Sequence, residues 1–393
     1  MFRSRHPQLI AGALSLFAIT SLLSANELKK QQAQVKGLLI IQLGDGETAG
    51  TAAQMNATVT RKKHKKSGFE LGFNQKVGKM MQGSSDEVEK FIRVRHSKKL
   101  PKNARIELAF ADKFTPKDGP SAAVACAIMS DALFSGRDID PGFAVTGDMT
   151  ATGEVRPVGG VRSKISGAIR KKCTLIGVPD ANKTTLSDAY ILEGLKPLYD
   201  IQVFSLKTFE EAEAIAYENR TKEVQEAIDE FGMVQKAMRN REGYVFNAKV
   251  QEKLRAIVKT CPNHLSARLL LLHGLKRGPQ RLSLEGSIAG INKRGTKLSS
   301  MLDDQSWQEA GGNDDVLAKL RNDLSKIRPK LDKRTVDYAD AYRELAEFFK
   351  KYRGRKILTP DVSRDFKASI QKLTIERKKL YNNPEVREEL MMD

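Results

Sequence analysis

The chain has 393 residues, of which 40% are hydrophobic and 29% are charged, and its formal net charge is +19. This length and hydrophobic content are sufficient for two domains with their own cores. The three cysteines, Cys126, Cys173 and Cys261, are widely spaced and form no Cys-x-x-Cys motif. Their pattern argues against a disulfide framework and against a zinc site, although a single pair such as Cys173 with Cys261 stays open.

The N-terminus has the outline of a targeting segment. Basic residues such as Arg3 precede a mostly apolar stretch from Leu9 to Leu23, and Ser24-Ala25 follow. This pattern predicts a secretory signal peptide over residues 1–25. Retention as an N-terminal anchor is the alternative, because Leu23 is larger than the small residue preferred there. In both cases we expect the body of the protein in an exported compartment, either periplasmic or secreted.

Strand-like runs follow at Lys36–Leu43 and Ala53–Arg61, and the first candidate for chemistry comes after them. Ser121 follows Gly119-Pro120 and precedes an alanine-rich apolar run without glycine or proline, which predicts a buried helix. N–H groups in a first helical turn lack intrahelical partners, so they could hold an oxyanion beside the hydroxyl. Ala122 at this helix start is a supporting candidate. The alternative is that Ser121 only caps its helix.

The chain contains five histidines, and none of them is an obvious base for Ser121. Lys164, on a second predicted helix, can act as a base only when neutral, so its pKa of about 10.4 must fall to about 7 or 8. A shift of about 3 units costs about 4 kcal/mol and requires desolvation plus nearby positive charge. Ile165 and Ile169 could supply the desolvation, and Arg162 could supply the positive charge. The alternative is a solvated surface lysine.

Several ordered motifs surround these two residues. They are Thr115–Ser121, Ala144–Asp148, Gly153–Gly160 and Lys164. Their order and spacing resemble the proteolytic domain of the Lon family of Ser-Lys peptidases, and the similarity extends over residues 36–217. The resemblance implies an α/β (α+β) proteolytic fold, with Ser121 as nucleophile and Lys164 as base.

The resemblance also implies roles for two further residues and an assembly. Thr146 would hydrogen-bond the Lys164 amine and orient it, and Asp118 would border the active site. Without the resemblance, Thr146 is an ordinary strand-end threonine and Asp118 a turn or N-cap acid. The chain departs from the family pattern at Ala123, usually glycine, and at Asp148, usually glutamate, which affects the substrate groove and regulation rather than the dyad. The family association further implies a homo-oligomeric ring, typically of six subunits.

Strand and helix patterns alternate as far as Tyr217, and charged amphipathic helices dominate residues 218–393. Helices are predicted at 222–240, 247–259, 265–275, 314–327, 334–352 and 361–381. We therefore expect an all-α accessory domain after the α/β domain. The segment Gly290–Lys297 has the order Gly-Thr-Lys and is not a phosphate loop. No ATPase module and no cofactor are predicted within this chain.

Positive charge is concentrated in residues 241–300, which contain 12 basic and 3 acidic residues. This segment is the best candidate to contact an anionic partner such as a membrane surface, a wall polymer or an acidic protein segment. A nucleic-acid partner is not expected, because the chain has no recognisable binding motif.

These observations predict an exported, ATP-independent serine endopeptidase whose substrates are unfolded or exposed polypeptide segments. One alternative is a catalytically idle scaffold whose basic helical half binds a partner, and another is an enzyme that processes only its own chain.

Overall fold

The computed structural model describes residues 28–42, 48–61, 68–111, 118–303, 314–352 and 359–391. The predicted signal peptide and residues 115–117 of the first motif lie outside these ranges. Among the described helices, none combines the length and the apolar character that crossing a bilayer requires.

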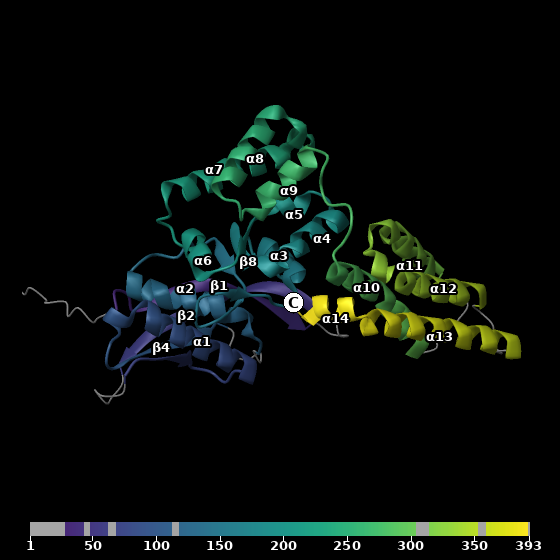
Figure 1. The fold of residues 1–393 in the computed structure, drawn as a ribbon, viewed down its shortest axis with the longest axis horizontal. Helices are drawn as coiled ribbons and strands as arrows, with labels where there is room; N and C mark the ends of the chain where they lie inside the picture. The colour runs from purple at the N-terminus through teal and green to yellow at the C-terminus, as the bar shows by residue number, and fades with distance from the viewer. Residues whose placement is uncertain are drawn as a thin grey trace, which may run out of the picture.

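A mixed seven-stranded sheet forms the centre of the N-terminal half, in the order β3-β4-β2-β1-β5-β8-β9 (Figure 1). Its strands are β1 (Gln32–Gln42), β2 (Thr48–Arg61), β3 (Glu70–Phe73), β4 (Ala104–Phe110), β5 (Phe143–Val145), β8 (Leu175–Pro179) and β9 (Gln202–Leu206). The β1–β2 and β2–β4 pairs are antiparallel and the remaining pairs are parallel. A separate ribbon pairs β6 (Asp148–Met149) with β7 (Val155–Arg156).

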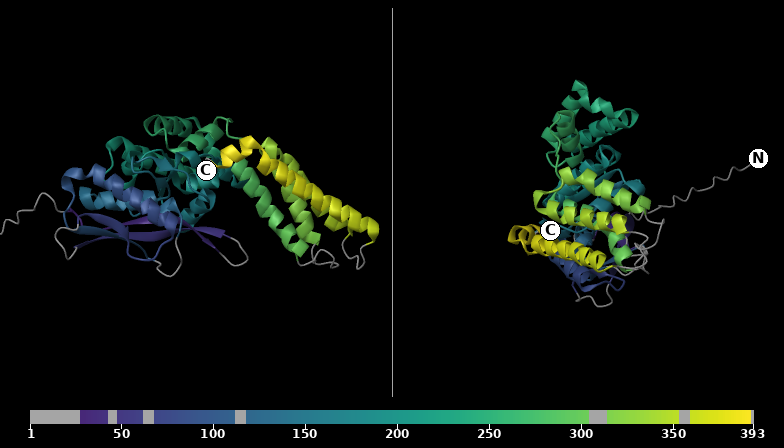
Figure 2. Two further views of the ribbon diagram at one scale, coloured as in Figure 1. Left: turned by 60° about the horizontal axis from the view of Figure 1, so that its bottom comes forward. Right: turned by 90° about the vertical axis from the view of Figure 1, so that its right-hand side faces the viewer.

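The strands alternate with helices, which confirms the predicted α/β class for this half. These helices are α1 (Lys79–Arg95), α2 (Ala123–Ser135), α3 (Val161–Arg170), α4 (Thr184–Glu193), α5 (Lys196–Asp200) and α6 (Phe209–Ala216). The left view of Figure 2 shows the purple and blue strands as one layer with blue helices above it. Every residue of α2 from Ala123 to Phe134 is buried, as its apolar sequence predicts.

The helix that carries Lys164 packs unusually close to the sheet. A Cβ added to Gly50 of β2 would lie 1.8 Å from the carbonyl oxygen of Ser163, and one added to Gly167 would lie 2.4 Å from the carbonyl carbon of Gly50. Arg170 then donates a hydrogen bond to the Gly50 carbonyl at 2.7 Å. Two glycines therefore allow backbone-to-backbone contact, which fixes the depth at which α3 lies on β2.

Replacement of Gly50 with alanine should destabilise the protein by about 3 kcal/mol, because a helix backbone occupies the space of the new methyl group. Gly83→Ala is the matched control, since its added Cβ meets nothing within 4 Å. That control should stabilise helix α1 by up to about 1 kcal/mol. Chemical denaturation of both variants measures the two changes. Equal stability of Gly50→Ala and wild type would contradict the close packing of α3.

The helical region after residue 217 has two parts. In the first, α7 (Lys222–Asn240), α8 (Ala248–Thr260) and α9 (Leu265–Gly274) pack into the same core as the sheet. The second has its own core and contains α10 (Leu284–Asp303), α11 (Asp314–Ile327), α12 (Val336–Tyr352), α13 (Pro360–Asn382) and α14 (Pro384–Met391). Figure 1 shows α7–α9 at the top and α10–α13 extending to the right.

Helix α4 connects the second helical part to the α/β domain. The buried carboxylate of Asp188 accepts hydrogen bonds from the backbone N–H and the hydroxyl of Ser283, directly before α10. Lys330 donates to the Ile191 carbonyl at 3.0 Å, and the Ile191 side chain belongs to the second core. The Ser283 hydroxyl accepts from the Gly286 N–H at 2.9 Å and so caps α10, and an acid of the α/β domain holds this cap in place.

Two expectations from the sequence are corrected or refined by these elements. All three cysteines are free and buried, so the pairing of Cys173 with Cys261 that had stayed open does not occur. Residues 290–297 lie inside α10, a helix that the sequence did not predict, and a helical segment cannot form a phosphate loop.

Candidate active site

Ser121 lies in a 3-10 turn, Pro120–Ala122, that continues directly into α2. The N-cap residues are Gly119 for the turn and Ala122 for the helix, and neither segment has a side-chain cap. The capping interpretation of Ser121 is therefore wrong. Among the described residues its hydroxyl group has no hydrogen-bond partner, so its oxygen is available to react.

The backbone of this turn is attached to the end of β5. The Ser121 carbonyl accepts hydrogen bonds from the Thr146 hydroxyl at 3.2 Å and from the Gly147 N–H at 3.0 Å. The Val124 N–H donates to the Gly147 carbonyl at 3.2 Å. Gly119 has a φ of 108°, a backbone conformation that favours glycine, and so allows the chain to turn into the helix. These contacts hold the serine in one position relative to the strand end.

Lys164 lies on α3, which begins after Gly160 in the left-handed conformation, and its side chain points into the protein. The residue is only 2% exposed, and its ammonium nitrogen donates to the Thr146 hydroxyl at 3.1 Å. Burial lowers the pKa of Lys164 to about 8, because the charged form loses its hydration. Thr146, which is fully buried, therefore accepts from the lysine and donates to the serine carbonyl.

The expectation that Arg162 helps to lower this pKa is wrong. The Arg162 guanidinium group donates two hydrogen bonds, at 3.0 and 2.6 Å, to Glu193 on α4. Ile165 is buried, as the desolvation argument requires. Burial alone accounts for the lowered pKa of Lys164.

Asp118 and Asp148 connect the site to helix α1. Asp118 accepts hydrogen bonds from the Met81 N–H at 3.2 Å and from the Gly119 N–H at 2.8 Å, and so caps α1 from another segment. Asp148 accepts from the Ser84 hydroxyl at 2.7 Å, and Ser84 also contacts the Pro120 carbonyl at 3.2 Å. Asp118 directly, and Asp148 through Ser84, therefore join residues 118–120 to helix α1.

Ser84 was missed by the sequence analysis, and no local signal indicates it. It lies 36 residues before Pro120, on a different helix. Ala122 is 4% exposed and stands at the junction of the 3-10 turn and α2. The N–H groups of Ser121 and Ala122 belong to the first turn, where helices leave donors without intrahelical partners. These donors are the ones that could face an oxyanion.

A serine at a helix start, a buried lysine and a threonine that contacts both residues are groups that acyl transfer can use. In agreement with this, residues 21–209 match the family model described as the Lon protease (S16) C-terminal proteolytic domain. Residues 21–209 are thus a Lon-type proteolytic domain, and the predicted resemblance is confirmed.

Curated relatives give the same assignment. The mitochondrial Lon protease homolog of Saccharomyces cerevisiae is 36% identical over 129 residues, which are 31% of this chain and 11% of that protein. The Lon protease of Erwinia amylovora is 30% identical over 155 residues, 38% of this chain and 19% of the relative. The Lon protease of Leptospira interrogans is 34% identical over 149 residues, which are 37% of this chain and 17% of that protein. The matches thus span less than a fifth of each relative. As a Lon-type proteolytic domain, this one is related to serine peptidases.

Proposed function

We propose that the protein is a serine endopeptidase in which Ser121 is the nucleophile and Lys164 the general base. The observation that supports this most directly is the buried Lys164 amine, which is hydrogen-bonded to Thr146 at 3.1 Å. A lysine with a pKa of about 8 is neutral in about one molecule in ten at pH 7, compared with about one in three thousand for an unperturbed lysine. The burial thus supplies the neutral amine that the reaction requires.

The proposed reaction has two stages. Neutral Lys164 accepts the Ser121 proton as the serine oxygen attacks the peptide carbonyl, and N–H groups at the start of α2 stabilise the oxyanion. Lys164 then gives the proton to the leaving amine, which releases the first product and leaves an acyl-enzyme. A water molecule, deprotonated by Lys164, hydrolyses this ester and regenerates Ser121. Thr146 keeps the amine oriented throughout.

The proposed substrates are unfolded or exposed polypeptide segments, cleaved without ATP. The proteolytic domain supports polypeptides as the substrates. The helical structure of the described residues between 222 and 391, without a phosphate loop at residues 290–297, supports cleavage without ATP. We also propose that the protein is exported, from the pattern of residues 1–25, and that it assembles into a ring, from its family. Catalytic idleness and self-processing are the outcomes that the following experiments distinguish.

Cleavage of an unfolded casein-like protein without ATP tests the proposed activity. Wild type should cleave it, while Ser121→Ala and Lys164→Ala should reduce the rate at least a thousandfold. Ser166→Ala and Lys171→Ala are matched controls on or next to the same helix and should retain activity. Absence of cleavage by an intact, assembled wild-type protein would favour the scaffold alternative. Cleavage of the protein's own chain alone would favour self-processing.

The rate of cleavage should rise with pH, because only the neutral form of Lys164 accepts a proton. Below the folded pKa of about 8 the second-order rate constant should increase about tenfold per pH unit, and it should level off above that pKa. A pH–rate profile on a short peptide substrate measures this. A flat profile from pH 6 to 9 would contradict the role of Lys164 as base.

A further inference from the structure

One end of the α7–α9 unit carries exposed aromatic and basic side chains, which we call the apical patch. It consists of Tyr244, Phe246, Lys249, Lys276 and Arg277, which lie in the 3-10 turn between α7 and α8, at the start of α8 and after α9. Tyr244 is 43% and Phe246 50% exposed, and the three basic residues are exposed as well. Exposed aromatic rings beside cations are costly to leave in water and typical of a contact surface.

The three segments of the apical patch are held together by specific contacts. The ring of Phe246 lies 5.4 Å from that of His273 on α9. Gln251 donates to the Val245 carbonyl at 3.3 Å and to the Gly274 carbonyl at 3.0 Å. A Cβ on Gly274 would lie 2.5 Å from the Val245 carbonyl oxygen, so glycine permits this close approach. The turn that carries Tyr244 and Phe246 therefore lies against the end of α9, which Lys276 and Arg277 follow.

Lys276 occupies a backbone position at which glycine is the usual residue. Its φ is 57°, in the left-handed region, and the Arg277 N–H donates to the Leu272 carbonyl to close the end of α9. A side chain in this conformation is strained relative to glycine. The same conformation occurs at Lys172 after α3, so it marks a helix end and places Lys276 at the exposed end of α9.

The positive charge of the apical patch is not neutralised locally. Among the described residues, no carboxylate forms an ion pair with Lys249, Lys276 or Arg277. Of the nearby acids, Glu242 accepts a hydrogen bond from the Tyr199 hydroxyl at 2.8 Å, and Glu252 lies on α8 one turn after Lys249. The patch thus keeps a net positive charge, within a segment of 12 basic and 3 acidic residues.

We propose that the apical patch docks the protein on an anionic phospholipid surface. The rings of Tyr244 and Phe246 would enter the headgroup region, and the cations would pair with lipid phosphates. The patch belongs to the α7–α9 unit, which lies at the top of Figure 1, and its exposed rings and cations match the apolar and anionic parts of a lipid surface. This interaction is independent of Ser121 chemistry and would hold the peptidase domain near a membrane.

Cosedimentation of the full chain with vesicles tests the proposal. Wild type should bind phosphatidylglycerol–phosphatidylcholine vesicles at least tenfold more tightly than pure phosphatidylcholine vesicles, and added salt should weaken this binding. The double variants Lys276→Glu/Arg277→Glu and Tyr244→Ser/Phe246→Ser should each lose at least tenfold in affinity. The charge control is Lys98→Glu/Lys99→Glu, an equal change on two exposed lysines of the α/β domain, and it should bind within about twofold of wild type.

Three results would overturn the proposal. Equal binding of wild type to neutral and anionic vesicles would show that the N-terminal segment or another surface carries the interaction. Equal losses in the patch and control charge variants would show that only net charge matters. Tighter binding to polyglutamate or single-stranded RNA than to vesicles, lost in the patch variants, would assign the patch to a different partner. Thermal melting and casein cleavage of each variant should match wild type.

Discussion

Replacement of Lys164 with methionine should stabilise the folded protein by about 3 kcal/mol at pH 7, although it removes the proposed base. Methionine has a similar length and no charge to desolvate. The Thr146 hydroxyl would keep its hydrogen bond to the Ser121 carbonyl. Cleavage of peptides should fall about a thousandfold in the same variant, so the prediction joins a gain of stability to a loss of activity.

The stability gain should depend on pH in a specific direction. Burial lowers the pKa of Lys164 from 10.5 to about 8, so the unfolded chain binds more protons than the folded one between these values. The penalty for burying the amine is complete below pH 8 and disappears as the pH rises toward 10.5. The difference in unfolding free energy between Lys164→Met and wild type should therefore be largest at pH 7 and shrink by pH 10.

Urea denaturation at pH 7 and pH 10 measures both differences, and the comparison of two proteins cancels groups that titrate in both. Lys171→Met is the control, because Lys171 is exposed and its replacement should change stability by less than about 0.5 kcal/mol. A Lys164→Met protein that is less stable than wild type at pH 7 would show that the amine is well solvated in the fold.

The sequence was sufficient to predict the α/β class, the helical second half and the Lon-type proteolytic domain, because hydrophobic periodicity and ordered motifs are local signals. It did not predict α10, since Gly286, Gly290 and Gly295 lower its helix propensity. The structure gives a reason for two of them. A Cβ on Gly286 would lie 2.2 Å from the Asp188 carboxylate, and one on Gly295 would lie 2.5 Å from the Tyr342 ring. The requirement for glycine at these two positions comes from tertiary contacts, which a helical sequence pattern does not indicate.

In the candidate site, too, some residues could be predicted from local motifs and others depend on tertiary contacts. Ser121, Lys164 and Thr146 could be proposed from motif order, but the roles of Ser84 and Arg162 depend on which helices meet. Asp118 caps α1, which agrees with the simpler interpretation of Asp118 as an N-cap acid. Long-range polar contacts join residues that no local pattern relates, and so the contacts of Ser84 and Arg162 emerged only from the structure.

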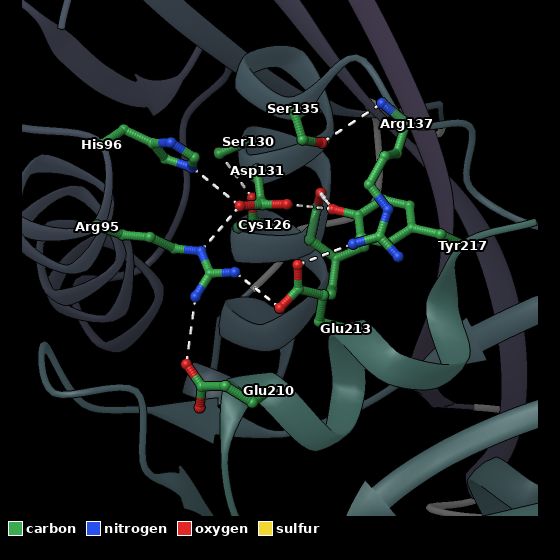
Figure 3. A network of polar contacts seen from close by, with 11 residues as sticks. Arg95, His96, Cys126, Ser130, Asp131, Ser135, Arg137, Glu210, Glu213 and Tyr217 are labelled. Atoms are coloured by element: carbon green, nitrogen blue, oxygen red, sulfur yellow. Dashed lines mark hydrogen bonds and ion pairs between the residues drawn. The ribbon is translucent and has the colours of Figure 1, made fainter. Parts of the chain in front are cut away.

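A second large effect is expected at the other end of the helix that follows Ser121. Asp131 on α2 is 1% exposed and accepts hydrogen bonds from the Arg95 guanidinium at 2.9 Å and the Tyr217 hydroxyl at 2.7 Å, while His96 Nε2 lies 2.9 Å away (Figure 3). Burial alone would raise the pKa of Asp131, but the contacts with His96, Tyr217 and Arg95 outweigh it and lower the pKa to about 2. The carboxylate thus joins α1, α2 and the residue after α6.

Asp131→Asn should destabilise the protein by about 3–5 kcal/mol. The substitution removes the carboxylate that pairs with the Arg95 guanidinium, and the new amide N–H groups would face groups that are themselves hydrogen-bond donors. Arg95 retains contacts with Glu210 and Glu213 on α6, which sets the lower end of this range. Asp138→Asn is the control: its side chain is 71% exposed and pairs with Lys30, so its loss should cost less than about 1 kcal/mol.

The pH dependence of the same group gives an independent check. Its folded pKa of about 2 lies below the usual 3.8, so its stabilising contribution is present above pH 4 and disappears as the pH falls toward 2. Wild type and Asp131→Asn should therefore differ most in urea denaturation near neutral pH and converge in acid. Because α2 also positions Ser121, the variant should lose cleavage activity at temperatures where it is partly unfolded. An unfolding free energy within 1 kcal/mol of wild type at pH 7 would show that the network contributes little to the α1–α2–α6 packing.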